Sequence, residues 1–110
     1  MSPKDDVVYL RHMLDAIEKI ETYISGVTRE TFENNNLVID AVCRELEIIG
    51  EASARLSASF KEDSNIFPWS KIVGMRNQLI HGYGEVDNIV VWDTCRNDLP
   101  SLKQAIAKII

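Results

Sequence analysis

The sequence predicts an all-helical fold, an antiparallel bundle of four to five helices. The chain of 110 residues contains only 5 glycines and 3 prolines, which is too few for a turn-rich β fold. Apolar residues recur at helical spacing along most of the chain. Because 45 % of the residues are hydrophobic, a chain of this length can form one hydrophobic core, and we expect a single domain over residues 1–110.

The first helix is predicted to begin after Ser2, since serine is a good cap and Pro3 suits the first helical position. Gly26 is a suitable stop. Residues 28–34 predict a short helical turn or loop. The expected apolar face comprises Val7, Leu10, Leu14, Ile17 and Ile24, with Glu21 as its polar exception.

A second, longer helix is predicted to start near Asn35 or Asn36 and to end where residues 63–68 interrupt it. Phe67 precedes a proline and therefore disfavours helical backbone, which marks a boundary. The predicted apolar face of this helix continues without a break through Val38, Val42, Leu46, Ile49, Ala52, Leu56 and Phe60.

Two further helical segments complete the predicted bundle. The third helix opens at Pro68 and runs to about His81, and the last segment runs from Asp87, a good cap, to Ile110. Pro100 lies inside the last segment and should kink or split it, because proline lacks a backbone donor. The expected apolar face of this segment consists of Val90, Val91, Cys95, Leu99, Leu102, Ile106 and Ile109.

Composition excludes several functional classes. A net charge of −5 argues against a protein that coats nucleic acid non-specifically, although it permits a local basic cleft. The sequence shows neither a signal-peptide pattern nor an apolar run long enough to span a membrane, so we expect a soluble cytoplasmic protein. Cys43 and Cys95 lack metal-type spacing and predict reduced thiols in or near the core. We expect no metal and no cofactor.

One window, residues 74–83, contains residue types that suit phosphodiester chemistry. Arg76 and His81 lie five residues apart at a predicted helix end, where both side chains can face a common space. Arginine offers a fork of donors that matches a phosphate, and histidine can exchange a proton near neutral pH. Such a pair could cleave RNA, whose 2′-hydroxyl is an internal nucleophile. Taken alone, an arginine and a histidine here are more often solvated or paired residues.

Basic residues elsewhere could extend such a site. Lys71, Arg44 and Arg55 could line a path for RNA, although each alone is more often a solvated charge. Glu51 could tune Arg76, although an exposed or ion-paired glutamate is the commoner situation.

Several ordered blocks resemble the HepT toxins of the HEPN superfamily. Arg76, four intervening residues, His81, one residue and Tyr83 are similar to the family motif. The lead-in 68–77, the second-helix block 49–57 and the closing segment 86–100 also resemble that family, so the likeness covers nearly the whole chain. Several blocks in one order are far more specific than a single Arg–His pair.

The resemblance implies a helical, homodimeric ribonuclease whose cleft between subunits is lined by Arg76 and His81, with Asn77 in support. It also implies a type VII toxin–antitoxin pair, in which an MntA-like nucleotidyltransferase antitoxin transfers AMP from ATP to Tyr83. The sequence hypothesis is therefore a metal-independent endoribonuclease toxin acting on RNA. Two alternatives stay open: a non-catalytic nucleotide- or substrate-binding partner of a nucleotidyltransferase, and a purely structural dimer.

Overall fold

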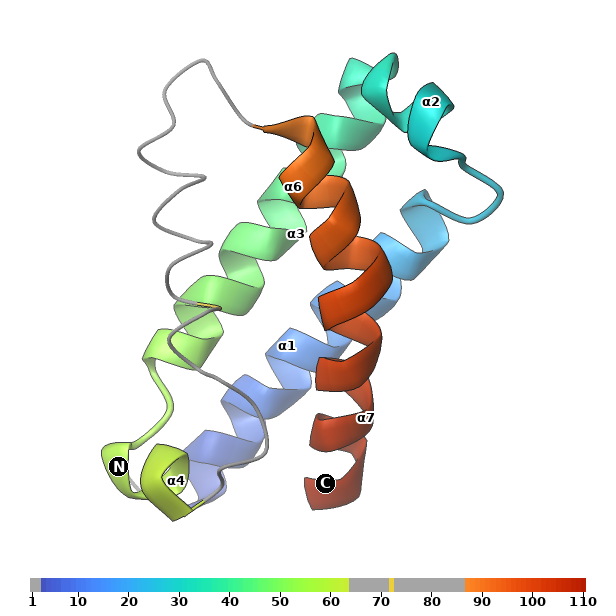
Figure 1. Cartoon of the computed structure of the whole chain (residues 1–110). Helices are drawn as coiled ribbons and strands as arrows, with labels where there is room; N and C mark the ends of the chain where they lie inside the picture. The colour runs from blue at the N-terminus through green and yellow to red at the C-terminus, as the bar shows by residue number, and fades with distance from the viewer. Residues whose placement is uncertain (1–2, 64–71, 73–86) are drawn as a thin grey trace.

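The computed structural model describes residues 3–63, 72 and 87–110, and every element within these ranges is helical. Three long rods form the bundle (Figure 1). Two of them are α1 (Pro3–Tyr23) and α3 (Asn36–Ala54). The third is continuous and consists of α6 (Asn88–Asp93), the π-helical turn η1 (Thr94–Asp98) and α7 (Leu99–Ile109). The predicted all-helical fold is confirmed for the described part of the chain.

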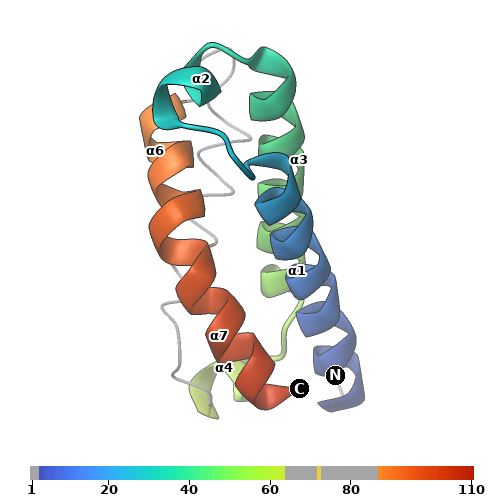
Figure 2. The same cartoon turned by 90° about the vertical axis from the view of Figure 1, so that its right-hand side faces the viewer.

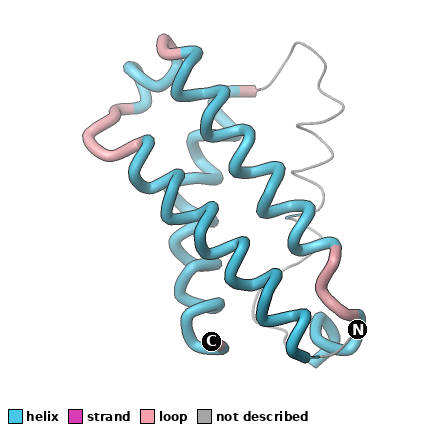
Figure 3. The backbone as a smooth tube through the Cα atoms, turned by 180° about the vertical axis from the view of Figure 1, so that it is seen from behind, coloured by secondary structure: helices cyan, strands magenta, loops and turns pink. Residues whose placement is uncertain are grey.

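The core lies between these three rods. Helices α1 and α3 run antiparallel along much of their length, as the view from behind shows (Figure 3). Met13 and Ile20 of α1 are fully buried although neither belongs to the predicted face, whereas the predicted Leu14 is only half-buried. The apolar face of α1 is therefore rotated by part of a turn from the prediction. Side chains from all three rods are completely buried: Leu10, Met13, Ile17, Ile20, Val42, Leu46, Ile49, Leu102 and Ile106.

The junction between α1 and α3 follows the predicted signals. Gly26 adopts a φ of 74°, a left-handed conformation that ends α1 and that glycine accepts without strain. A short helix, α2 (Arg29–Glu33), begins with a capping box in which Thr28 and Thr31 satisfy each other's backbone N–H groups. Asn35 then caps α3 by accepting a hydrogen bond from the N–H of Val38 at 3.2 Å.

The other end of α3 corrects the prediction. The helix ends at Ala54 instead of continuing to Phe60, and a separate short helix, α4 (Ala58–Asp63), follows. Ser57 begins this helix by accepting a hydrogen bond from the N–H of Phe60 at 3.1 Å. The apolar spacing continues across the break because Leu56 is buried and Phe60 packs against the core. Periodicity alone therefore did not show the break.

The last rod was predicted to be kinked or split near Pro100, and the structure has a π-helical turn, η1, just before this proline. The N–H of Leu99 donates to the carbonyl of Thr94, five residues earlier, and Pro100 follows in the first turn of α7. Proline has no N–H and crowds the carbonyl four residues before it, and the wider turn relieves that conflict. The predicted apolar face was too broad, because Val90 and Ile109 are 41 % and 39 % exposed.

The three rods are viewed side-on in Figure 2, where the last rod lies opposite α1 and α3 and the two termini lie at one end. Phe32 of α2 closes the other end by packing on Trp92 of α6, with ring centroids 5.1 Å apart. None of the helices in the described ranges is long and apolar enough to cross a membrane.

Candidate active site

The predicted catalytic cluster falls outside the described residues. Arg76, Asn77, His81 and Tyr83, together with Lys71, belong to the ranges 64–71 and 73–86, so the structure does not test their arrangement. What it does define is the framework on either side of these ranges.

The structure describes the two residues that flank this stretch of chain, Asp63 and Asp87, and one residue inside it, Ile72. α4 ends at Asp63, and Asp87 caps α6 by accepting hydrogen bonds from the N–H groups of Ile89 and Val90 at 3.0 and 3.3 Å. These two points lie at opposite ends of the bundle (Figure 1). Between them, Ile72 is helical and only 3 % exposed within the core cluster. The core therefore anchors the chain four residues before Arg76.

The two other predicted RNA contacts, Arg44 and Arg55, are exposed residues of α3 and of its C-terminal cap. Neither forms an ion pair with a residue that the structure describes. Eleven residues of helix advance about 16 Å and return to nearly the same side. An extended strand that follows α3 could therefore meet the two guanidinium groups in turn.

The cysteines are not available as nucleophiles near neutral pH. Burial is the main cause that raises the pKa of the Cys95 thiol to about 12, and burial with nearby Asp40 and Glu47 raises that of Cys43 to about 11. Both are free cysteines, Cys95 buried and Cys43 half-buried. The raised pKa values favour the protonated thiol over the reactive thiolate. The sequence analysis expected unpaired thiols in or near the core, and both cysteines are free.

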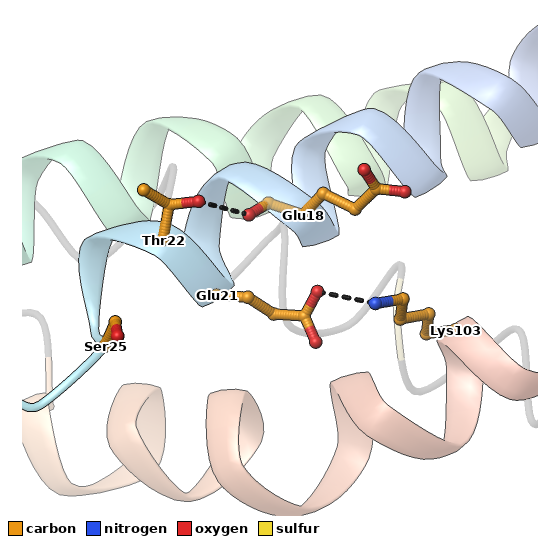
Figure 4. A pocket seen from close by; sticks show the side chains of 5 residues that line it. All are labelled: Glu18, Glu21, Thr22, Ser25 and Lys103. Carbon is orange, nitrogen blue, oxygen red and sulfur yellow. Dashed lines mark hydrogen bonds and ion pairs between the residues drawn. The ribbon is translucent and has the colours of Figure 1, made fainter.

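A groove between α1 and α7 has the wrong chemistry for RNA. This cavity of about 560 Å³ is lined by Glu18, Glu21, Thr22, Ser25 and Lys103 (Figure 4). Lys103 Nζ donates to Glu21 Oε1 at 2.8 Å, and this hydrogen bond raises the lysine pKa. Since Glu21 already engages the lysine, the remaining carboxylate of Glu18 would repel a phosphate.

A cation that the sequence analysis did not single out lies on the π-turn. The guanidinium carbon of Arg96 lies 5.4 Å from the ring centroid of Trp92, a cation–π arrangement. The i, i+4 spacing of these residues on a predicted helix was the available signal. Arg96 also lines a second cavity, of about 300 Å³, next to Glu21 and Ser25. Across the described residues, no group of three or more histidine, cysteine, aspartate or glutamate side chains could hold a metal ion.

Comparison with known proteins decides the family. The sequence profile described as "Ribonuclease HepT-like" matches residues 13–109. The chain belongs to the HepT-like ribonuclease family. The matched range includes every position of the Arg76–His81–Tyr83 motif and the described bundle from the middle of α1 to the end of α7. The family resemblance inferred from the sequence is therefore confirmed.

Two relatives match this chain over nearly the full length of both proteins, and both are named as ribonucleases. A protein of Thermococcus cleftensis named "Probable ribonuclease HepT" is 41 % identical over 101 residues, which cover 92 % of both chains. A Methanocaldococcus jannaschii protein named "Putative RNase" is 35 % identical over 106 residues, or 96 % of this chain and 97 % of that one.

A larger relative contains a similar region as one part of a longer chain. The M. jannaschii protein named "Gamma-glutamylcyclotransferase and putative RNase" is 41 % identical over 107 residues. These residues are 97 % of this chain but only 48 % of that protein, so the present chain spans about half of its length. No solved structure matches the chain significantly.

Proposed function

We propose that this HepT-like chain is a metal-independent endoribonuclease that acts as the toxin of a type VII toxin–antitoxin pair. The observation that carries the proposal is the family match over 13–109, a range that contains an intact arginine–histidine–tyrosine motif. The named relatives support ribonuclease activity in proteins of the same length.

The proposed chemistry needs only two side chains and the substrate's own hydroxyl. His81 takes the proton of the RNA 2′-hydroxyl, or supplies the proton to the leaving 5′-oxygen, and solvent water carries out the other proton transfer. The 2′-oxygen attacks the adjacent phosphorus, the bond to the 5′-oxygen breaks, and a 2′,3′-cyclic phosphate remains. Arg76 holds the phosphate and stabilises the charge that develops on its oxygens, while Asn77 orients the site.

Auxiliary contacts follow from the exposed basic residues. Arg44 and Arg55 on α3, and Lys71 before the motif, are proposed to hold the RNA strand on either side of the cleaved bond. The net charge of −5 makes such local contacts necessary, because the surface as a whole repels RNA.

Regulation is proposed to act through Tyr83. An MntA-like nucleotidyltransferase would transfer AMP from ATP to the tyrosine hydroxyl and release pyrophosphate. The product adds a phosphodiester charge of about −1 and a bulky nucleoside two residues from His81. Repulsion, competition for Arg76 and steric blockage would each exclude RNA. Gly82 and Gly84 flank the tyrosine in sequence and favour access by the partner enzyme.

A direct test compares purified wild type, His81→Ala and Arg76→Ala on RNA in buffer containing EDTA. We expect cleavage by wild type, products ending in cyclic phosphate, and a loss of about 100-fold or more in His81→Ala. An oligonucleotide with a single 2′-deoxy substitution at the cleaved position is the matched substrate control and should stay intact. Equal cleavage by His81→Ala and wild type would contradict the mechanism.

The composite site in a homodimer has its own test. When Arg76→Ala and His81→Ala chains are refolded together, a site that takes each residue from a different subunit is restored once per mixed dimer. About a quarter of wild-type activity should then return, because half of the dimers are mixed and each has one intact site. No recovery, or a monomeric mass in light scattering of an active sample, would contradict a shared site.

Modification is tested by intact mass after expression with and without the nucleotidyltransferase. Added AMP on Tyr83 with loss of cleavage supports the toxin and its control. If unmodified protein binds nucleotide tightly but never cleaves RNA, the binding-partner alternative replaces the ribonuclease proposal.

A further inference from the structure

A buried carboxylate ties the beginning of α1 to the beginning of α4. Asp6 is only 5 % exposed, so its charge would be costly without hydrogen bonds. Both of its oxygens are used by one residue: the N–H of Ser57 donates to Oδ1 at 2.8 Å, and the Ser57 hydroxyl donates to Oδ2 at 2.7 Å. The contact joins residues 51 positions apart in sequence.

The same serine determines where α4 starts. Ser57 Oγ accepts from the N–H of Phe60 at 3.1 Å, and the Ser57 carbonyl accepts from the N–H of Lys61 at 3.2 Å. One hydroxyl donates to Asp6 and also accepts from the first turn of α4. The position of this hydroxyl therefore links the position of the Asp6 carboxylate to the start of α4. Asp6 thereby sets the start and direction of α4 relative to α1.

This direction matters because α4 precedes the motif. α4 ends at Asp63, and Arg76 and His81 follow within the next 18 residues of sequence. Asp6 and Ser57 would act on catalysis through the start and direction of α4.

We propose that Asp6 is a positioning residue for the ribonuclease site and acts through Ser57 on α4, the helix that precedes the motif in sequence. The proposal rests on the ribonuclease function proposed above. Holding reacting groups in place contributes to the rate of the chemical step, and a displacement of about 1 Å can cost about 100-fold. The pair should therefore influence kcat more than KM.

The experiment measures kcat and KM for RNA cleavage by the full chain, well below the melting temperature of every variant. Asp6→Asn keeps the size of the side chain but replaces one of the two oxygens that accept from Ser57 by a donor. Ser57→Ala removes the hydroxyl together with its hydrogen bonds to Asp6, to the N–H of Phe60 and to the Ser59 hydroxyl. Ser57→Thr keeps the hydroxyl and is the conservative variant. We expect about a 10-fold lower kcat in the first two variants with KM nearly unchanged, and recovery to near wild type in Ser57→Thr.

Thr28→Ala is the matched control because it removes a helix cap from α2, at the other end of the bundle. It should lower stability without changing kcat. Unchanged kcat in both Asp6→Asn and Ser57→Ala would overturn the proposal, as would an equal loss of kcat in Thr28→Ala. Should Asp6→Asn fail to fold, the comparison of Ser57→Ala with Ser57→Thr decides alone.

Failure of the proposed function gives a different pattern. Wild-type protein that does not cleave RNA overturns both proposals together. Wild-type protein that cleaves, and loses cleavage on His81→Ala, retains the ribonuclease proposal whatever Asp6→Asn does.

Discussion

The two junctions at opposite ends of the α1–α3 pair are built differently. At the α2 end, Gly26 and the Thr28–Thr31 capping box use residues at most a few positions apart, and their side chains are exposed. At the α4 end, the serine cap depends on a buried aspartate 51 residues away. The first junction can form from local sequence, whereas the second requires that α1 and α3 already be packed together.

The difference explains which boundaries the sequence revealed. The stop at Gly26, a short helical turn over residues 28–34 and a helix start near Asn35 are predicted from short windows of sequence, and the structure agrees with them. Serine is a residue that often caps helices, so Ser57 is a possible cap. However, apolar residues continue at helical spacing on both sides of it, from Leu46 to Phe60, and this pattern predicts an unbroken helix. Only the contact with Asp6 selects the cap over another helical turn.

The largest stability effect is expected from breaking the long-range junction. Asp6→Ala leaves the half-buried N–H and hydroxyl of Ser57 without the carboxylate that accepts from both, and should cost about 1–3 kcal/mol of unfolding free energy. Ser57→Ala alone should cost a similar amount. In urea titrations the double variant should be less destabilised than the sum, by about 0.5–3 kcal/mol, because both changes remove one interaction. Strict additivity would show that the two residues do not act as a pair.

The second effect concerns the glycine at the local junction. A Cβ added at Gly26 meets nothing within 4 Å, so Gly26→Ala tests backbone conformation without a clash. The left-handed φ of 74° should cost alanine about 1–2 kcal/mol. Thermal unfolding measures it, with exposed Ser25→Ala as the control. A loss above about 3 kcal/mol would mean that the junction is more than a local turn.

A smaller effect is expected from the capping box. Thr28→Ala removes a side-chain acceptor at an exposed helix start and should cost about 1 kcal/mol. Combined with Ser57→Ala, the losses should add within about 0.5 kcal/mol, since the two junctions share no partner. A clear coupling between them in urea titrations would contradict the independence of the two ends.

The smallest effect belongs to the exposed ion pair that joins α1 to α7. The hydrogen bond to Glu21 raises the Lys103 pKa above its ordinary value of 10.5. The pair therefore contributes fully at pH values below 10.5 and loses its contribution as the pH rises through the raised pKa. Wild type and Glu21→Gln should differ slightly in melting temperature at pH 7, less in high salt, and not at all above that pKa. A difference that grows with pH would contradict the assignment.

The sequence by itself determined the helical class, the stop at Gly26, the helix start near Asn35, the cap at Asp87 and the disturbance before Pro100. Each depends on the conformational preference of a residue and its near neighbours, or on helical periodicity. It also identified Arg76, Asn77, His81 and Tyr83 as the candidate site, through the family motif and not through geometry.

Tertiary structure decided what depends on distant partners. It placed Met13 and Ile20 in the core because the face of α1 must meet two neighbours, α3 and α7, instead of one. It ended α3 at Ala54 and buried Asp6, a charged residue near the chain start that no local pattern marks for the interior. The physical reason is that a carboxylate can be buried only when packing brings its donors to it, and for Asp6 those donors lie half a chain away.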